Sequence, residues 1–150
     1  MQSKKIHAKS FRDLEVYQKA QALAQDIYNL TKAFPKEETY SLTDQLRRSS
    51  RSVGAQIAEA WGKRRYERHF ISKLTDADAE QMETQHWLSV AASCQYLSND
   101  QTEQLISELS RVGRMLNAMM RKAYLFCGKS GKADQGEEEV TDERLPITDR

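Results

Sequence analysis

Apolar residues recur every three or four positions along four segments of the chain, and this spacing predicts four amphipathic helices. The first segment starts at Ser10, a predicted N-cap with Asp13 three residues on, and stops at Pro35. Its apolar positions alternate at spacings of four and three, as in a heptad seam: Val16, Ala20, Leu23, Ile27, Leu30 and Phe34.

The second segment is expected to begin at Ser41, with Asp44 repeating the cap pattern, and either to end near Gly62 or to continue, bent, into the third. The third segment ends around residues 97–99, and polar residues dilute its seam: Phe70, Leu74, Ala77, Gln81, Thr84, Leu88, Ala91 and Gln95. The fourth starts at Asp100 with Glu103, stops at Gly128 and has the most regular seam: Leu105, Leu109, Val112, Leu116, Met119, Ala123 and Phe126.

Four helices with short connections predict an all-α fold, an antiparallel up-down-up-down four-helix bundle. Pro and Gly are scarce, two and six in the chain, which argues against a β architecture because strands need frequent turn residues. We expect a flexible basic N-terminus over residues 1–9, the bundle over residues 10–128 and a disordered acidic tail over residues 129–150.

The net charge of +1 hides an uneven distribution of charge. Residues 132–150 contain three basic and seven acidic groups, a sum of −4, which leaves +5 on the other 131 residues. Such a tail could mimic nucleic acid and cover a basic face of the same chain, or it could only increase solubility.

The stretch from Arg47 to Arg68 concentrates positive charge, with seven basic residues against two acids, Glu59 and Glu67. Phosphate groups are bound by exposed, ordered cations, and Tyr66 within this stretch could stack on a base. The alternative is that a surface helix simply carries solvated Arg, partly paired with acids on its neighbours. As a hypothesis, the phosphate contacts come from seven residues: Arg47, Arg48, Arg51, Lys63, Arg64, Arg65 and Arg68.

Other candidate chemistry is weaker. Glu83 and His86 have the Glu-x-x-His spacing of bundle di-iron sites, but no other His follows an acid by three residues, so a second copy of the pair is missing. The two cysteines, Cys94 and Cys127, have no metal or redox spacing and indicate reduced thiols in a cytoplasmic protein. We therefore expect no cofactor, no metal and no enzymatic activity.

Two further features concern partners. Met115, Met119 and Met120, with Trp87 and Tyr124, could form a partner groove, but their helical spacing favours core and self-association. No apolar run of about 18 residues exists to span a membrane, so no membrane partner is expected.

Several short motifs follow one another between residues 11 and 127: Phe11-Arg-Asp-Leu-Glu-Val-Tyr-Gln-Lys-Ala, Ile27-Tyr28, Thr31 with Phe34-Pro35 and Glu38, Tyr40-Ser-Leu-Thr-Asp-Gln-Leu-Arg-Arg-Ser, Ser52-Val53, Ile57-Ala58-Glu59, Phe70-Ile-Ser-Lys-Leu, Glu83-Thr84-Gln85 and Trp87-Leu88. In their order and spacing, the chain resembles the four-helix-bundle family named for proteins encoded in intervening sequences of 23S rRNA genes. Gln56 and Ala60 stand where many relatives have Asn and Gly, and His86 where an apolar residue is common.

The resemblance implies a homo-oligomer, a pentamer of bundles, without enzymatic activity. Relatives include accessory proteins of diversity-generating retroelements, which are similar to basic, ring-shaped partners of nucleic acid and a reverse transcriptase. By this analogy we expect binding of RNA or DNA. The rival expectation is a protein-binding scaffold without nucleic-acid binding, which recruits its partner through the bundle ends or the Met-rich surface.

Overall fold

A computed structural model describes residues 7–127 of the 150-residue chain, and every regular element in that range is helical. Three predicted features lie outside the described residues: residues 1–6 of the basic N-terminus, the helix end at Gly128 and the acidic tail. The expected all-α class is therefore confirmed for the described range. The elements are two 3-10 helices, η1 (Phe11–Asp13) and η2 (Lys36–Glu38), and four α-helices, α1 (Glu15–Thr31), α2 (Leu42–Gly62), α3 (Glu67–Ser93) and α4 (Asn99–Arg121).

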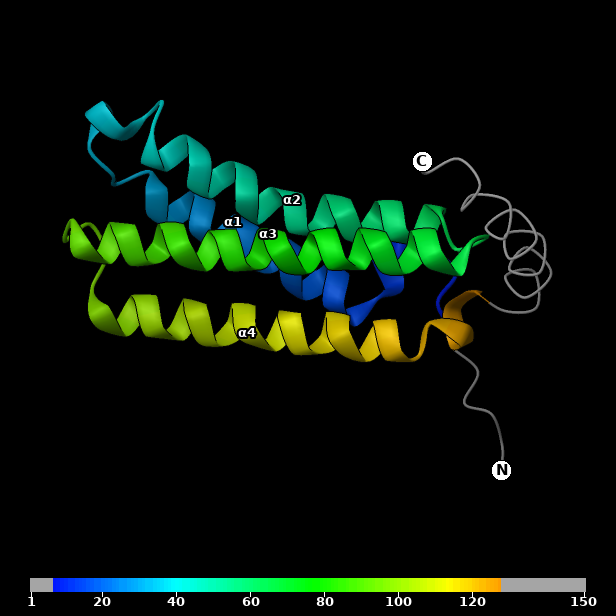
Figure 1. The fold of residues 1–150 in the computed structure, drawn as a ribbon. Helices are drawn as coiled ribbons and strands as arrows, with labels where there is room; N and C mark the ends of the chain where they lie inside the picture. The colour runs from blue at the N-terminus through cyan, green and yellow to red at the C-terminus, as the bar shows by residue number, and fades with distance from the viewer. Residues whose placement is uncertain (1–6, 128–150) are drawn as a thin grey trace, which may run out of the picture.

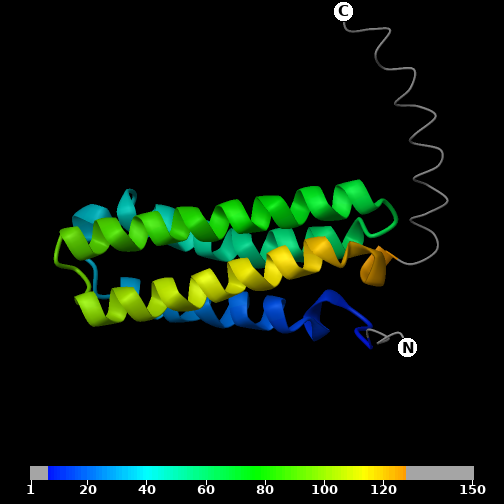
Figure 2. The same cartoon turned by 60° about the horizontal axis from the view of Figure 1, so that its bottom comes forward.

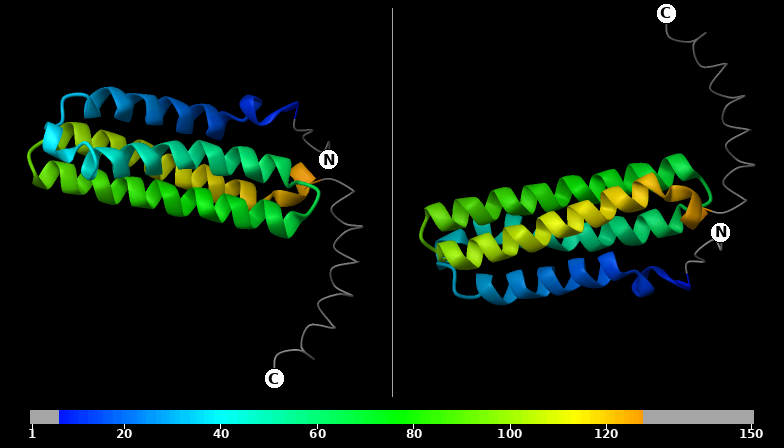
Figure 3. Two further views of the ribbon diagram at one scale, coloured as in Figure 1. Left: turned by 90° about the horizontal axis from the view of Figure 1, so that it is seen from above. Right: turned by 90° about the horizontal axis from the view of Figure 1, so that it is seen from below.

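The four α-helices lie side by side, and the chain turns back after α1, after α2 and after α3 (Figure 1). Contacts join α1 to α2, α2 to α3, α3 to α4 and α4 to α1, so the helices form a closed ring around one core. The α1–α2 and α3–α4 connections lie at one end of the molecule. The α2–α3 connection, residues 123–127 and the start of the described chain lie at the other end (Figures 1 and 3).

The core contains the apolar seams that the sequence predicts. In α4, Leu109, Val112 and Leu116 are at most 2% exposed, and in α1 Val16, Leu23 and Ile27 are at most 4% exposed. Leu30 and Met119 are only half-buried, because each lies at the edge of its stripe. Helix periodicity thus placed the buried faces correctly.

Two of the three polar residues predicted for the third seam are buried, and each has a partner; the prediction is wrong for Gln95, which is exposed and lies beyond the end of α3. Thr84 is fully buried, and its hydroxyl donates to Ser49 Oγ on α2 at 3.0 Å. Gln81, 3% exposed, donates to Asp78 Oδ1 at 2.9 Å and accepts from Gln85 Nε2 at 2.7 Å. Buried groups with partners avoid the free-energy cost of desolvation without hydrogen bonds, and they favour one helix register over others.

The predicted start of the first α-helix is wrong by four residues, because the N-cap of α1 is Leu14 and not Ser10. Ser10 and Asp13 do form a reciprocal capping box, but it caps the start of the 3-10 helix η1 and not of α1. Leu14 then has an extended backbone (φ −71°, ψ 125°), so α1 begins only at Glu15. The interruption buries Leu14, which is 7% exposed, against the core.

Two other predicted helix starts used different capping groups. Ser41 is the N-cap of α2, as expected, but its side chain makes no cap bond; the backbone N–H of Leu42 donates instead to the Glu38 carboxylate at 3.1 Å. Helix α4 begins at Asn99, and its capping box joins Ser98 to Gln101 rather than involving Asp100 and Glu103. An N-cap residue needs a non-helical backbone, and the local turn, not residue type alone, selects it.

Helix α3 ends at Ser93, earlier than the expected end at residues 97–99. Gln95 adopts a left-handed backbone with φ 64°. The N–H of Tyr96 donates to the Ala91 carbonyl and the N–H of Gln95 to the Ala92 carbonyl, each at 2.9 Å. These two bonds make a Schellman motif, in which Gln95 occupies the position usually taken by Gly.

Replacing Gln95 with Gly is therefore expected to raise the free energy of unfolding by about 1 kcal/mol, because Gly adopts the left-handed conformation without a Cβ clash. Urea unfolding followed by circular dichroism measures the change. Ser93→Gly is the matched control. Ser93 is the last helical residue of α3, and Gly in a helix should lower the free energy of unfolding. A loss of stability in Gln95→Gly would contradict the assigned motif.

Candidate nucleic-acid interface

The structure divides the predicted basic stretch into two groups. Helix α2 ends at Gly62 and α3 begins at Glu67, so the stretch is not one helix with one cationic face. Arg47, Arg48 and Arg51 lie in the first half of α2. Lys63, Arg64 and Arg65 lie in the connection and Arg68 in the first turn of α3; we call these four residues the bundle-end cluster. The 12 residues from Arg51 to Lys63 correspond to about 18 Å along the α2 axis.

The first group forms a compact site around Tyr28 of α1. The Arg47 and Arg51 guanidinium carbons lie 4.6 Å and 5.2 Å from the centroid of the Tyr28 ring, and Lys32 Nζ lies 4.9 Å from it. We call Lys32, Arg47 and Arg51 with Tyr28 the α1–α2 cluster. One aromatic ring therefore holds three cations by cation–π attraction.

Hydrogen bonding orders this cluster further. Arg47 is half-buried, and its Nε donates to Thr31 Oγ1 at 2.8 Å. The Thr31 hydroxyl in turn lies 2.9 Å from the Tyr28 carbonyl, to which it donates. Arg47 is thus tied to the last turn of α1, and its guanidinium has little freedom left to lose on binding.

None of the three cations in the α1–α2 cluster forms an ion pair with any residue between 7 and 127. Like charges held around one ring repel each other, and an anion placed among them would relieve that repulsion. The cluster is therefore an anion-attracting surface rather than a set of internal salt bridges.

Sequence reasoning found Arg47 and Arg51 but missed Tyr28 and Lys32. Both pairs have the i,i+4 spacing that places two side chains on the same helix face. That spacing could have indicated each pair separately. Their meeting depends on the register between α1 and α2, which no local pattern contains.

Arg48 is a strongly exposed member of the predicted set. Its side chain is 74% exposed and lies 3.8 Å from the Asp44 carboxylate, which is itself 44% exposed. Exposed pairs of this kind contribute little to stability and exchange readily with other anions. Arg48 is thus available to a phosphate at the edge of the α1–α2 cluster.

The bundle-end cluster is interleaved with aromatic side chains. The Arg64 guanidinium carbon lies 3.5 Å from the Trp61 ring centroid, and Arg64 Nε donates to the Trp61 carbonyl at 2.8 Å. Arg65 lies over the ring of Tyr66 at 5.6 Å. The predicted proximity of Tyr66 to basic residues is therefore observed, and Lys63 beside it is exposed.

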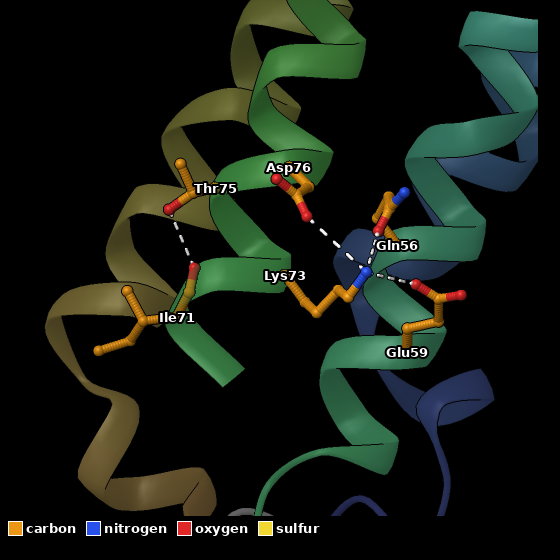
Figure 4. Close-up of polar contacts among 6 residues, drawn as sticks. All are labelled: Gln56, Glu59, Ile71, Lys73, Thr75 and Asp76. Carbon is orange, nitrogen blue, oxygen red and sulfur yellow. Dashed lines mark hydrogen bonds and ion pairs between the residues drawn. The ribbon is translucent and has the colours of Figure 1, made fainter. Parts of the chain in front are cut away.

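Glu59, one of the two acids within the basic stretch, faces away from these cations. Lys73 of α3 pairs with Glu59 at 3.0 Å and with Asp76 at 3.8 Å, and it also donates to Gln56 Oε1 at 3.4 Å (Figure 4). The hydrogen bond to Glu59 is the main cause that raises the pKa of Lys73 above its ordinary value of 10.5. The stabilisation from this pairing is present below pH 10.5 and is lost as pH rises through the higher folded pKa.

The middle of α3 has the opposite charge. Burial, and then the neighbouring Glu83 and Asp76, raise the pKa of Glu80. Carboxylates that disfavour each other's ionisation would repel a phosphate backbone. A nucleic acid would therefore contact the α1–α2 side and the bundle end rather than the outer face of α3.

The other candidate sites do not assemble in the described part of the chain. His86 is exposed, and its ring lies 4.7 Å from the ring of Trp87 between centroids. No three His, Cys, Asp or Glu between residues 7 and 127 are placed to hold a metal ion. Burial raises the pKa of Cys127 to about 11, which keeps this thiol protonated at neutral pH. Ser49 and Ser50 are buried in the bundle, at 2% and 3% exposed.

The methionine set is split between different environments. Met115, Met119 and Met120 are half-buried, whereas Tyr124 is 59% exposed. Helices α1 and α4 lie beside each other (Figure 2), and a groove of about 560 Å³ separates the start of α1 from the second half of α4. Its lining is mainly apolar: Ala8, Leu14, Val16, Met115, Ala118, Met119 and Phe126, with His7, Asp13 and Glu15 at its edge.

A family model for the 23S rRNA-intervening sequence protein matches residues 12–118. The chain belongs to this family. The match spans α1, α2, α3 and most of α4, and so includes both cationic clusters.

A solved structure supports the assignment. The crystal structure of a protein with unknown function from the S23 ribosomal protein family of Bacteroides thetaiotaomicron VPI-5482 is similar to this family member, with a TM-score of 0.64 and 29% sequence identity over 70% of this chain and 97% of that chain. No curated protein matches the chain. Within residues 7–127, no helix has both the length and the apolar character needed to cross a bilayer.

Proposed function

We propose that this chain is a non-enzymatic, homo-oligomeric, up-down-up-down four-helix bundle that binds RNA or DNA through its phosphates. The observation that carries the proposal is the α1–α2 cluster, in which three cations surround Tyr28 and have no acidic partner in the described range. The phosphate contacts are assigned to Lys32 and to the seven predicted residues: Arg47, Arg48, Arg51, Lys63, Arg64, Arg65 and Arg68.

Two physical arguments favour phosphate over another anion. The two basic groups lie about 18 Å apart along α2, a span that a single small anion does not bridge but a nucleic-acid backbone does. Guanidinium groups also match phosphate oxygens with two donors each. These contacts position a backbone and do not read its sequence, so binding is expected to be largely sequence-independent.

The homo-oligomeric state, with five copies, follows from the family resemblance. A ring of bundles would repeat each cationic cluster around its symmetry axis, and multivalent contact with one strand would then raise the overall affinity. We place the activity in the cytoplasm, where the free thiols Cys94 and Cys127 would stay reduced.

Salt dependence tests the proposal directly. Fluorescence-anisotropy titrations with structured RNA and duplex DNA should show log affinity falling linearly with log salt, because each neutralised phosphate releases counterions. Contacts from the α1–α2 cluster alone predict a slope of about −2.7 on duplex DNA, and contacts from both clusters predict a steeper slope. No binding to either nucleic acid at 50 mM salt, or about the same affinity at all salt concentrations, would contradict the proposal.

A chain that ends at Lys129 belongs in the same titration. Tighter binding or a steeper slope without residues 130–150 would assign the acidic tail a competitive role. Unchanged curves would leave that tail a solubilising segment.

A protein-binding scaffold is the second candidate, and the apolar groove between α1 and α4 favours it. A partner held in this groove would resist salt, because apolar contacts are not screened. Capture of a defined protein that survives nuclease treatment and high salt, together with no nucleic-acid binding, would support the scaffold over the nucleic-acid interface.

A further inference from the structure

The bundle-end cluster differs from the α1–α2 cluster in how its aromatic rings are used. Around Tyr28, three cations occupy the ring, so little of it is left for a base. At the α2–α3 connection, by contrast, aromatic residues and cations alternate along the chain: Trp61, Lys63, Arg64, Arg65, Tyr66, Arg68 and His69. Interleaving of this kind is typical of surfaces that hold single strands.

Arg64 and Trp61 form a rigid base of this surface. The guanidinium stacks on the indole at 3.5 Å, and its Nε is held by the Trp61 carbonyl at 2.8 Å. A guanidinium held over a ring can stack on a base with its other face while its N–H groups reach a phosphate.

Tyr66 provides a second ring beside the first. It precedes α3 as the N-cap residue without a side-chain cap bond, and it is half-buried. Its ring contacts the His69 ring at 5.2 Å between centroids, tilted by 51°, and Arg65 lies over it at 5.6 Å. Since Tyr66 is not among the buried core residues, its ring is available for a ligand without unpacking the bundle.

The last described turn places a third aromatic group at the same end. Phe126 stacks on Phe70 at 5.5 Å, which fixes residues 123–127 against the start of α3. The charges of Glu67 and Arg64 act on the Cys127 thiol, so this turn lies next to the α2–α3 connection. The third aromatic group is Tyr124, two residues before Phe126, and it is 59% exposed. Residues 123–127 and the α2–α3 connection lie at the same end of the bundle (Figures 1 and 3).

We propose that the bundle end binds the unpaired bases of single-stranded RNA or DNA, with Tyr66 as the stacking platform and Arg64 as its companion. This inference rests on the proposed nucleic-acid binding and names its substrate class. In a duplex, the base faces are stacked on each other and only base edges and the backbone are accessible, so the rings at the bundle end would find no base face to stack on. Single strands expose base faces, and each stacked base adds affinity that does not depend on salt.

The test compares labelled 20-nucleotide single-stranded RNA and DNA with the matching duplexes, by fluorescence anisotropy on the full chain at the same series of salt concentrations. The intact protein should bind the single strands more tightly than the duplexes. Tyr66→Leu should weaken single-strand binding by about 10-fold and leave duplex affinity and the salt slope unchanged, because it removes a ring and no charge. Tyr66→Phe keeps the ring and should bind as the intact protein does.

Each outcome bears on one of the two proposals. Equal affinity for single strands and duplexes, or single-strand binding unaffected by Tyr66→Leu, would overturn the stacking site and leave phosphate binding intact. Absence of binding to any of the four probes would overturn the proposed function itself. Tighter binding of single-stranded RNA than of single-stranded DNA would indicate a further contact with the 2′-hydroxyl. Equal binding of the two would attribute the preference for single strands over duplexes to stacking alone.

Discussion

Replacement of Phe70 by alanine is expected to lower the free energy of unfolding by about 3–5 kcal/mol. Phe70 is fully buried (0% exposed) and stacks on Phe126 at an interplanar angle of 26°. Its loss would leave a cavity at the bundle end, where α3 begins and residues 123–127 pack on it. Urea unfolding followed by circular dichroism at 222 nm measures the change.

Tyr40→Ala provides the matched aromatic control. Tyr40 is 94% exposed, and its replacement should change stability by less than about 0.5 kcal/mol. A cost below about 1 kcal/mol for Phe70→Ala would show that the start of α3 does not depend on this packing. Equal effects of the two replacements would contradict the described core.

Replacement of Arg47, Arg48 and Arg51 by glutamate is expected to lower the affinity for duplex DNA by about 500-fold at 0.1 M salt, because three phosphate contacts release counterions with a combined slope of about 2.7. The salt slope should become shallower by the same amount. Helicity and oligomeric state should stay as in the intact chain. Anisotropy titrations, circular dichroism and analytical ultracentrifugation together test the three statements.

Two double variants make this experiment specific. Lys32→Glu with Arg51→Glu leaves the half-buried Arg47 and its bond to Thr31 in place, yet should still weaken binding strongly. Arg111→Glu with Arg114→Glu alters two exposed residues of α4 by the same total charge. Equal losses in both double variants would attribute binding to the overall charge of the protein and would refute a defined site at the α1–α2 cluster.

Within the described residues, the sequence predicted the helical segments and their buried faces well. The seam of α4 follows from residue spacing, which is a local property. For α2, the sequence left two alternatives open, an end near Gly62 or a bent continuation, and the structure shows the end at Gly62. The sequence also placed the polar residues Gln81 and Thr84 on the buried face of α3. It did not show their hydrogen-bond partners, which lie one turn away on α3 for Gln81 and on α2, at Ser49, for Thr84.

Helix ends were harder to predict because several residues compete to cap each one. Ser10 with Asp13, and Asp100 with Glu103, both resemble N-terminal signals, yet the first closes a 3-10 turn and the second lies inside a helix capped by Ser98. The left-handed backbone at Gln95 has no signal in residue type, since Gly is the usual residue there. Packing of the connecting segments decides among such alternatives.

For the candidate site, the sequence by itself determined where positive charge is concentrated and that Arg47 and Arg51 share a helix face. Only the tertiary structure placed Tyr28 and Lys32 of α1 next to those arginines. It also paired Glu59 with Lys73 of α3 and separated the bundle-end cluster from the α1–α2 cluster. The reason is physical. Helix periodicity is set by contacts within about four residues, whereas the meeting of α1 with α2 depends on the register of a shared core, to which residues from the whole chain contribute.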